Sequence, residues 1–342
     1  MKKITIIQPD DWHVHFRDEE MLKLVVPETD KIFGKCIVMP NLVPPIIDNR
    51  MAIEYQKRIK NYIKTNLKTY LTIYLTENTD VEDLVAAFKE KNVFAVKLYP
   101  LGATTNSNFG IKNLKNIMSV LATMEKNNIP LLIHGEETDP KIDIFDREKY
   151  FIDRTLSKIV RNFPMLRITL EHITTIDAID YINSNENIVG SITPHHLASN
   201  RNDMLVGGIR PHLYCLPILK RKTHQEELIR VAISGNEKFF LGTDSAPHEI
   251  ALKENHCGCA GVFNTTYTIQ ILTQIFENQR ALNNLEKFVS INGARHYKLP
   301  INEKKINLIK KDEPIKFINK LKMNNIEVKI YKPNFEVFWD IQ

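Results

Sequence analysis

Residues 12–16 read Trp12-His13-Val14-His15-Phe16, a short run in which apolar and imidazole side chains alternate. Alternation of this kind is typical of a β-strand, because every second side chain of a strand lies on the same face. Seven further runs rich in β-branched and aromatic residues follow, and amphipathic stretches such as residues 81–91 separate them. We therefore predict eight strands, at residues 12–16, 36–39, 69–75, 93–98, 131–134, 167–172, 188–193 and 238–242.

Strands that alternate with helices build parallel βαβ units, and eight such repeats predict a closed (β/α)8 TIM barrel with inserted loops. The alternative is an open, doubly wound sheet, which would carry a glycine-rich phosphate turn near its first strand. The chain has only 12 glycines, and Gly207-Gly208 falls late, between the seventh and eighth strands. We therefore expect one barrel domain over residues 1–342, with its core at about 9–300 and a C-terminal extension, residues 301–342, packed on the barrel.

The composition excludes several classes of protein. A hydrophobic content of 43% is enough for a large core and argues against disorder. The 46 basic and 41 acidic side chains leave a net charge of only +5, which is scattered and forms no basic stripe for nucleic acid. Four cysteines are too few for a disulfide scaffold, and no apolar run approaches 18 residues. We expect a soluble cytoplasmic protein without a membrane span or export signal.

Ionisable residues stand at the ends of several predicted strands. His134 closes the fifth strand, His172 closes the sixth, and Asp244 follows the eighth, while His13 and His15 lie on the first. Each histidine alone, and an isolated His-x-His pair, is more often structural than ligating. Barrel geometry, however, brings the carboxyl ends of all strands together. Four histidines and an aspartate gathered there form a nitrogen and oxygen ligand set that suits Zn²⁺.

Lys97 lies near the end of the fourth predicted strand, in the run Phe94-Ala95-Val96-Lys97-Leu98. One interpretation is a side chain whose stem is buried and whose ammonium reaches solvent. The other is a lysine buried beside metal ions, where its pKa falls. A neutral amine there can add CO₂ to become a carbamate that bridges two cations. The sequence leaves both interpretations open.

Together with the motifs around them, these residues resemble the short, class II bacterial-type dihydroorotases of the amidohydrolase superfamily. The resemblance covers most of residues 9–300. Its motifs are PDDWHVHFRD (9–18), VMPNL (38–42), KLYP (97–100), ATTNS (103–107), LLIHGE (131–136), IFDRE (144–148), EHITT (171–175), RPHLYCLP (210–217), GTDSAPH (242–248) and CGCAG (257–261).

The resemblance implies a binuclear zinc centre with a fixed ligand set. His13, His15 and Asp244 would hold one Zn²⁺, and His134 and His172 would hold the other. Carboxylated Lys97 and a hydroxide would bridge the two ions. All six ligand positions carry the expected residue type.

The resemblance also implies the reaction, which is the reversible cyclisation of N-carbamoyl-L-aspartate to L-dihydroorotate in de novo pyrimidine synthesis. Asp244 would carry the proton between water and the ring nitrogen. Arg17 lies two residues past His15, hence on the same strand face if the strand continues, and an arginine can grip the substrate carboxylate. The further residues that the resemblance places at the substrate are Asn41, His248, and backbone atoms of Leu216 and Ala260, with Thr104 and Thr105 on a loop that closes over it.

Two alternative functions remain open at this point. A related cyclic amidase, such as a dihydropyrimidinase, hydantoinase or allantoinase, shares the metal centre but has no need of a carboxylate clamp. A non-catalytic barrel that serves as a scaffold is the second alternative, although the intact ligand set argues against it. A homodimer is expected from the resemblance. His195 and His196 are predicted to point to opposite faces of a strand, so they could not chelate jointly.

Overall fold

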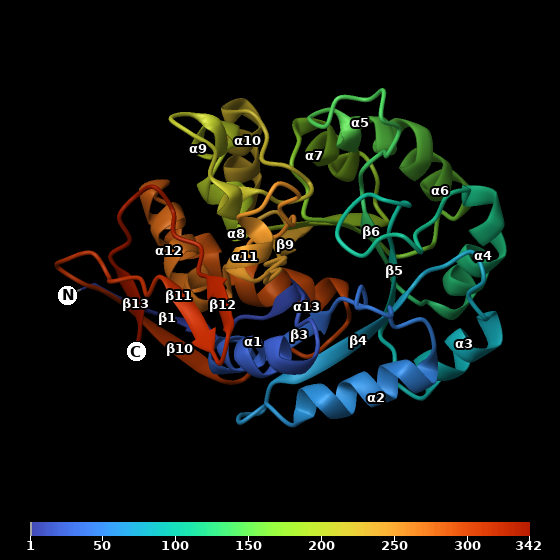
Figure 1. The fold of residues 1–342 in the computed structure, drawn as a ribbon, viewed down its shortest axis with the longest axis horizontal. Helices are drawn as coiled ribbons and strands as arrows, with labels where there is room; N and C mark the ends of the chain where they lie inside the picture. Colours follow the sequence, from blue (N-terminus) through green and yellow to red (C-terminus); the bar gives the residue numbers. More distant parts are fainter. Residues whose placement is uncertain (1) are drawn as a thin grey trace.

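Eight parallel strands, hydrogen-bonded in chain order, form the centre of the computed structural model, which describes residues 2–342 (Figure 1). They are β2 (Asp11–Val14), β3 (Lys35–Val38), β4 (Lys68–Tyr74), β5 (Ala95–Leu98), β6 (Leu131–His134), β7 (Ile168–Glu171), β8 (Ile188–Ile192) and β9 (Phe239–Leu241). Each predicted strand overlaps one of them, and the predicted (β/α)8 TIM barrel is confirmed.

The sheet closes between β2 and the segment that follows β9. The amide of Asp244 donates to the carbonyl of His13 at 2.8 Å, and the amide of His15 donates to the carbonyl of Ser245 at 3.1 Å. Buried Asp11 reinforces this junction, because its carboxylate accepts hydrogen bonds from the amide of His13 and from the amide and hydroxyl of Thr243. The closing bonds therefore lie at the residues that the sequence singled out as metal ligands.

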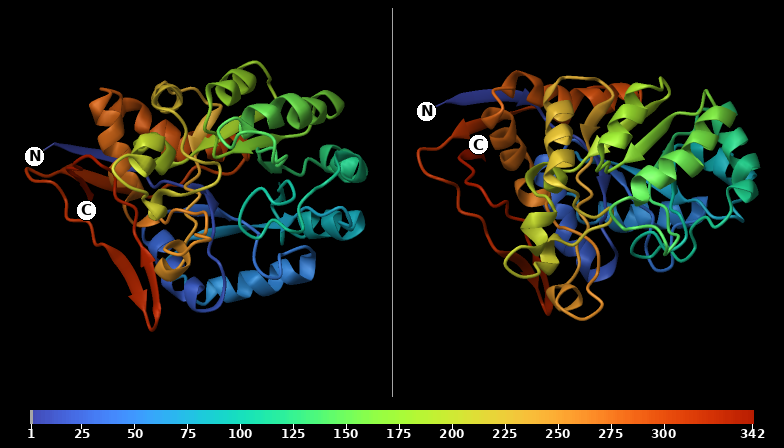
Figure 2. Two further views of the ribbon diagram at one scale, coloured as in Figure 1. Left: turned by 45° about the horizontal axis from the view of Figure 1, so that its top comes forward. Right: turned by 90° about the horizontal axis from the view of Figure 1, so that it is seen from above.

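Helices follow the strands and surround the barrel (Figures 1 and 2). Several begin at residues suited to cap a helix: Asp48, Asp80 and Thr175 accept hydrogen bonds from the first turns of α2, α3 and α7. The α-helices are α1 (Glu19–Ile32), α2 (Asn49–Lys60), α3 (Val81–Lys89), α4 (Met118–Asn127), α5 (Arg147–Phe151), α6 (Ser157–Asn162), α7 (Ile176–Asn183), α8 (Pro194–Ala198), α9 (Arg201–Leu205), α10 (Lys222–Ile233), α11 (Ile250–Lys253), α12 (Thr268–Asn278) and α13 (Asn292–His296). Short 3-10 or π turns are η1 (Leu114–Ile117), η2 (Ile152–Leu156), η3 (Pro211–Leu213), η4 (Thr265–Tyr267), η5 (Leu282–Asn284) and η6 (Lys287–Ile291). Within residues 2–342, no helix is both long enough and apolar enough to cross a membrane.

The N-terminal half of the barrel interior is packed with apolar side chains. Trp12 and Phe240 belong to this cluster, and Tyr297, which follows α13, packs against both. The Tyr297 hydroxyl also lies 2.9 Å from the hydroxyl of Thr169 on β7. Since side chains fill this end of the barrel, space for a small molecule is expected at its C-terminal end.

The two ends of the chain pair with each other outside the barrel (Figure 2). Strand β1 (Lys3–Ile7), which the sequence analysis did not predict, is antiparallel to β10 (Lys305–Lys310), and β10 pairs with β13 (Trp339–Ile341). Strands β11 (Lys320–Met323) and β12 (Ile326–Lys329) form a separate hairpin. Residues 301–342 also contact the helices that cover the barrel: Trp339 Nε1 donates to Glu277 of α12 at 2.9 Å.

The packing between α13 and the barrel floor predicts a destabilising substitution. A Cβ at Gly293 would lie 2.0 Å from Nε1 of Trp12, so Gly293→Ala should lower the free energy of unfolding by about 1–3 kcal/mol through overpacking. Denaturant unfolding measures the change. In a Trp12→Leu background, which lacks the indole ring that the new Cβ would meet, Gly293→Ala should cost less stability than it does in the parent. A Gly293→Ala variant as stable as the parent would contradict this packing argument.

Candidate metal centre and substrate pocket

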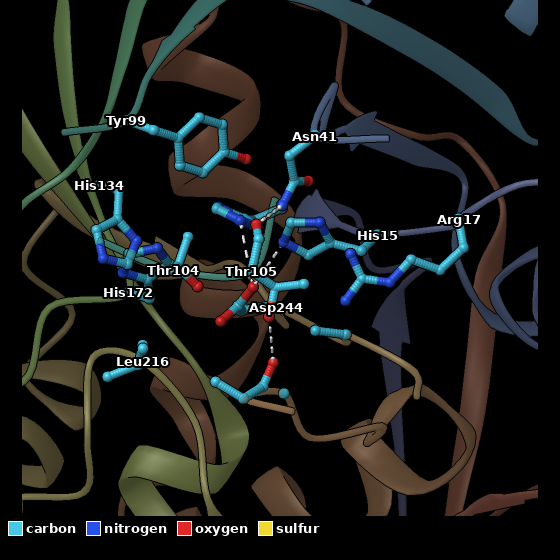
Figure 3. A pocket seen from close by; sticks show the side chains of 14 residues that line it. His15, Arg17, Asn41, Tyr99, Thr104, Thr105, His134, His172, Leu216 and Asp244 are labelled. Carbon is cyan, nitrogen blue, oxygen red and sulfur yellow. Dashed lines mark hydrogen bonds and ion pairs between the residues drawn. The ribbon is translucent and has the colours of Figure 1, made fainter. Parts of the chain in front are cut away.

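A pocket opens at the C-terminal ends of the barrel strands (Figure 3). Its lining contains most of the predicted site residues, and the remaining two lie beside it: Lys97 is buried on β5, and His248 contacts Arg17. The lining residues are His13, His15, Arg17, Asn41, Tyr99, Thr104, Thr105, His134, His172, Leu216, Asp244, Ala246, Ala260 and Gly261. The fold thus brings together residues that are up to 248 positions apart in the chain.

His13, His15 and Asp244 form the first group of buried metal-ligand atoms. Their donor atoms all lie within 4.8 Å of one another. Nε2 of His15 is 2.9 Å from Oδ1 of Asp244, and Nε2 of His13 is 3.4 Å from the same oxygen. Two imidazoles and a carboxylate at this spacing match the nitrogen and oxygen ligands of zinc.

His134 and His172 form a second group next to the first. Their ring centroids are 4.7 Å apart, and the ring of His172 is 5.1 Å from that of His13. Nδ1 of His172 is buried and has no hydrogen-bond partner anywhere in residues 2–342. A buried ring nitrogen without a partner is unfavourable by itself, and a bound cation would satisfy it.

Lys97 lies on β5 with its side chain fully buried. Its Nζ atom has no hydrogen-bond partner within the described chain, and it lies 5.1 Å from the ring centroid of Tyr99. The interpretation in which the ammonium reaches solvent is therefore wrong. Burial lowers the pKa of Lys97 to about 8, which increases the fraction of neutral amine that can react with CO₂.

The charges of the ligand groups suit a cation. Burial lowers the pKa of His15 to about 4 and that of His172 well below its usual range, so both imidazoles are neutral near pH 7. Burial alone would raise the pKa of Asp244, but its hydrogen bonds to His13 and His15 outweigh that effect and hold the pKa well below the usual range. His15, His172 and Asp244 are therefore in the protonation states in which these groups bind metal. Burial acts to lower the pKa of His13, but the carboxylates of Glu171 and Asp244 outweigh it and raise that pKa.

Three site residues adopt a left-handed backbone conformation. The φ angles are +57° at Arg17, +41° at His172 and +44° at Asp244. For residues other than glycine such angles cost about 1–3 kcal/mol each and persist only where the surrounding structure enforces them. The condition for a shared strand face with His15 is not met, because β2 ends at Val14, but Arg17 lines the pocket beside His15 as predicted.

Arg17 stands at one side of the pocket with part of its guanidinium free. Nε donates to the carbonyl of Pro247 at 3.1 Å, and Nη2 lies 3.0 Å from Nε2 of His248. Nη1 is buried and lacks a hydrogen-bond partner among residues 2–342. An unpartnered N–H fork in a closed pocket is suited to bind a carboxylate.

The loop that carries Thr104 and Thr105 lies over the pocket. The Thr105 hydroxyl donates to the carbonyl of Ala260 at 3.2 Å, and the Asn41 amide donates to the carbonyl of Thr105 at 3.0 Å. Asn106 in turn donates to the carbonyl of Asn41 at 3.0 Å. The loop is therefore held against both the end of β3 and the turn at residues 259–261.

Comparisons with known proteins identify the family. The model of the Amidohydrolase family matches residues 4–307. A dihydroorotase of Chelativorans sp. (strain BNC1) is 47% identical over 345 residues, with 100% of both chains covered. That of Jannaschia sp. (strain CCS1) is 48% identical over 344 residues, covering 100% of this chain and 99% of the relative. The chain belongs to the dihydroorotase family.

Solved structures agree with this membership. A dihydroorotase from Campylobacter jejuni superimposes with a TM-score of 0.90 at 34% identity, covering 99% of this chain and 97% of that one. The Saccharomyces cerevisiae dihydroorotase, in complex with 5-fluoroorotic acid, gives 0.91 at 30% identity with 100% and 99% covered. An L-hydantoinase from Arthrobacter aurescens gives 0.76 at 13% identity, which shows the shared barrel fold alone.

Two buried glutamates at this dihydroorotase site were not singled out from the sequence. Oε2 of Glu171 lies 2.8 Å from Nδ1 of His13, and it also accepts a hydrogen bond from Ser191. Oε2 of Glu136 lies 2.8 Å from Nε2 of His134. A carboxylate on the far nitrogen of a metal-binding histidine fixes the orientation of the ring. Each glutamate is adjacent or nearly adjacent to a ligand in the sequence, and this proximity was the available clue.

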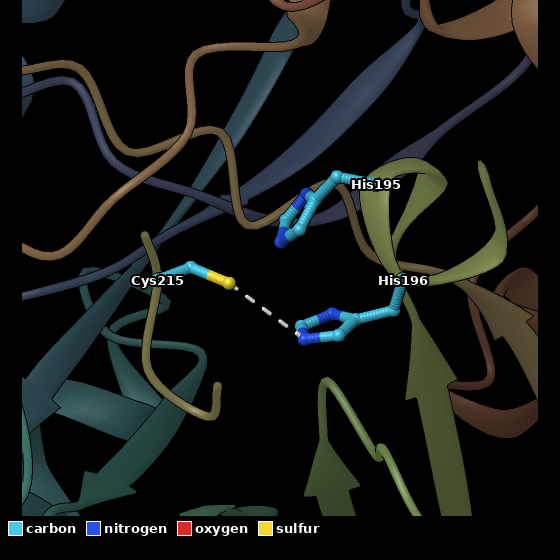
Figure 4. Close-up of side chains that lie close together, drawn as sticks. All are labelled: His195, His196 and Cys215. Carbon is cyan, nitrogen blue, oxygen red and sulfur yellow. Dashed lines mark hydrogen bonds between the residues drawn. The ribbon is translucent and has the colours of Figure 1, made fainter. Parts of the chain in front are cut away.

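The neighbouring pair His195 and His196 also differs from prediction (Figure 4). The two residues lie on helix α8 rather than on a strand, and their ring centroids are 4.5 Å apart. With Cys215 their donor atoms fall within 4.8 Å of one another. Both ring nitrogens of His196 are already engaged, by Thr193 at 2.8 Å and the carbonyl of Pro217 at 3.0 Å. Burial raises the pKa of the Cys215 thiol to about 12, so the thiol stays protonated near pH 7. We therefore interpret His195, His196 and Cys215 as a buried polar network.

The contact between Glu171 and His13 predicts an effect on metal affinity. Glu171→Gln keeps the size of the side chain but removes the charge that orients and polarises the imidazole, so metal affinity should fall by about 10–100-fold. Metal retained after dialysis against a graded chelator series measures the change. Glu186→Gln, at an exposed position, serves as the matched control. Equal retention in the two variants would contradict a role for Glu171.

Proposed function

We propose that this member of the dihydroorotase family interconverts N-carbamoyl-L-aspartate and L-dihydroorotate in the pocket described above, as a step of de novo pyrimidine synthesis. The observation that carries the proposal is the position of a buried ligand cluster next to the unpartnered Nη1 of Arg17. The reaction needs an activated water or amide and a cation for the substrate carboxylate. The lining of one pocket contains both the ligand cluster that would activate the water or amide and the arginine that would bind the carboxylate.

We propose two zinc ions as the cofactors. His13, His15 and Asp244 would hold one ion, His134 and His172 the other, and carboxylated Lys97 would bridge them. The orphaned atoms of Lys97 and His172 support this set. When bound, such ions lower the pKa of a coordinated water and polarise the scissile carbonyl.

Asp244 is the group proposed to move the proton. Its carboxylate is ionised and lies in the pocket lining, within hydrogen-bond distance of His15. In the hydrolytic direction it accepts a proton from the attacking water and passes it to the leaving ring nitrogen. In the direction of ring closure it removes the proton from the carbamoyl nitrogen, as microscopic reversibility requires.

The remaining pocket residues are proposed to bind the substrate. Arg17 and His248 face its carboxylate, while Asn41 and the backbone of Leu216 and Ala260 fix the ring. The loop with Thr104 and Thr105 excludes water from the site, and its hydroxyls donate hydrogen bonds to charge that develops on the substrate. From the family resemblance we further propose a single barrel domain that works as a cytoplasmic homodimer.

The substrate preference can be measured directly. The purified, zinc-loaded protein should hydrolyse L-dihydroorotate with a kcat/KM at least about 100-fold above those for dihydrouracil and hydantoin, since neither of these carries the carboxylate that Arg17 would bind. Equal or better turnover of dihydrouracil or hydantoin would support a related cyclic amidase instead. A protein that binds no zinc and shows no turnover with added zinc and bicarbonate would support the scaffold alternative.

Lys97→Ala tests the bridging role. Removing the amine eliminates the proposed carbamate, so the variant should bind less than half of the parental zinc and lose at least about 1000-fold in kcat, a change of roughly 4 kcal/mol in the activation barrier. Elemental analysis and steady-state kinetics report the two effects. Lys238→Ala is the control, because Lys238 is partly buried and directly precedes β9, at the end of the barrel opposite to the pocket. A Lys97→Ala variant with full zinc and near-parental rate would contradict the bridge.

A further inference from the structure

Lys253, the last residue of α11, has its ammonium group inside the protein. The three N–H bonds of the ammonium match three backbone carbonyls, those of Tyr214 at 3.0 Å, Cys259 at 2.9 Å and Gly261 at 2.6 Å. Across the part of the chain that is described, Lys253 forms no ion pair with a carboxylate. Its role is therefore to bind backbone rather than to balance a charge.

The three carbonyls belong to two segments that meet at the substrate pocket. Leu216 follows Tyr214 closely, and Ala260 lies between Cys259 and Gly261. Leu216, Ala260 and Gly261 line the pocket. The amide of Gly261 also donates to the carbonyl of Tyr214 at 3.0 Å, so the ammonium and this amide together fasten one segment to the other.

The contact with Cys259 also fixes the direction of the next amide. A trans peptide is planar, so the N–H of Ala260 points opposite to the carbonyl of Cys259 and hence away from the ammonium. Lys253 therefore sets which way this backbone donor faces. Burial lowers the pKa of Lys253 to about 8, so most of the group still carries its proton at pH 7.

We propose that Lys253 is a positioning residue that holds the backbone at Leu216 and Ala260 in place for the substrate and thereby determines its KM. The inference rests on the proposed function of the pocket. Lys253 itself lines no part of the pocket and acts only through the two segments that it joins.

The test is Lys253→Met, which keeps the length of the side chain and leaves three buried carbonyls without their donor. The KM for L-dihydroorotate should rise by about 10–100-fold, the range expected when hydrogen bonds from a charged donor are lost, while kcat falls less than about threefold. The zinc content should match that of the parent. Lys253→Arg, which retains the charge and the donors, should recover part of the KM. Lys253→Gln, which keeps two donors but loses the charge and the third donor, replaces the methionine variant if that one does not fold, and a smaller rise in KM is then expected.

Lys238→Met is the matched control, because Lys238 also donates to two carbonyls, those of Ile182 at 2.9 Å and Asn185 at 2.6 Å, but does so far from the pocket. It should lower thermal stability and leave KM within about twofold of the parent. A Lys253→Met variant with parental KM, or an equal rise in KM for Lys238→Met, would overturn the inference alone. Absence of dihydroorotate turnover in the zinc-loaded parent would overturn the proposed function, and the role of Lys253 with it.

Discussion

The closure of the barrel between its first and last strands is the constraint on which the site depends. Two backbone hydrogen bonds join the segment at His13 and His15 to the segment at Asp244 and Ser245. Asp11 adds two further bonds across the same junction, both from Thr243, to a carboxylate whose pKa burial raises to about 7. Since ligands of the proposed first metal lie on both sides of this junction, the metal site exists only in the closed barrel.

A cluster of ionisable groups inside a protein is unfavourable unless something compensates for it. Lys97 Nζ and His172 Nδ1 are buried with no hydrogen-bond partner among residues 2–342, and His172 and Asp244 have left-handed backbone angles. The apolar floor formed around Trp12, Phe240 and Tyr297 supplies the rigid packing that sustains this strain. A bound cation would satisfy the ring nitrogen, and a carbamate on Lys97 would turn that amine into a ligand, so that folding and metal binding would stabilise each other.

The proposed recognition of the substrate uses two cationic side chains in different ways. Within the described residues, Nη1 of Arg17 has no hydrogen-bond partner and is available to a ligand in the pocket. Lys253, in contrast, donates all three of its N–H groups to backbone carbonyls. The distinction follows from side-chain chemistry. A guanidinium has five donors and can bind backbone and ligand at once, while an ammonium with three carbonyl partners has none left over.

The sequence by itself determined the number and order of the barrel strands and the types of the proposed metal ligands, since periodicity and residue identity at strand ends are local properties. It did not reveal that His195 and His196 lie on a helix, that β1 pairs with β10, or that Glu171 and Glu136 contact the proposed ligands His13 and His134. It also did not foresee how Arg17 enters the pocket, because the left-handed turn there is imposed by neighbours rather than by the residue itself. The helix at His195 and His196 begins with Thr193 and Pro194, and Glu136 lies two residues from His134, so these two points were local signals that the prediction missed. Only the tertiary structure decided the pairing of β1 with β10, the contact of Glu171 with His13 and the turn at Arg17, because each depends on contacts between distant segments or on backbone strain that no local pattern encodes.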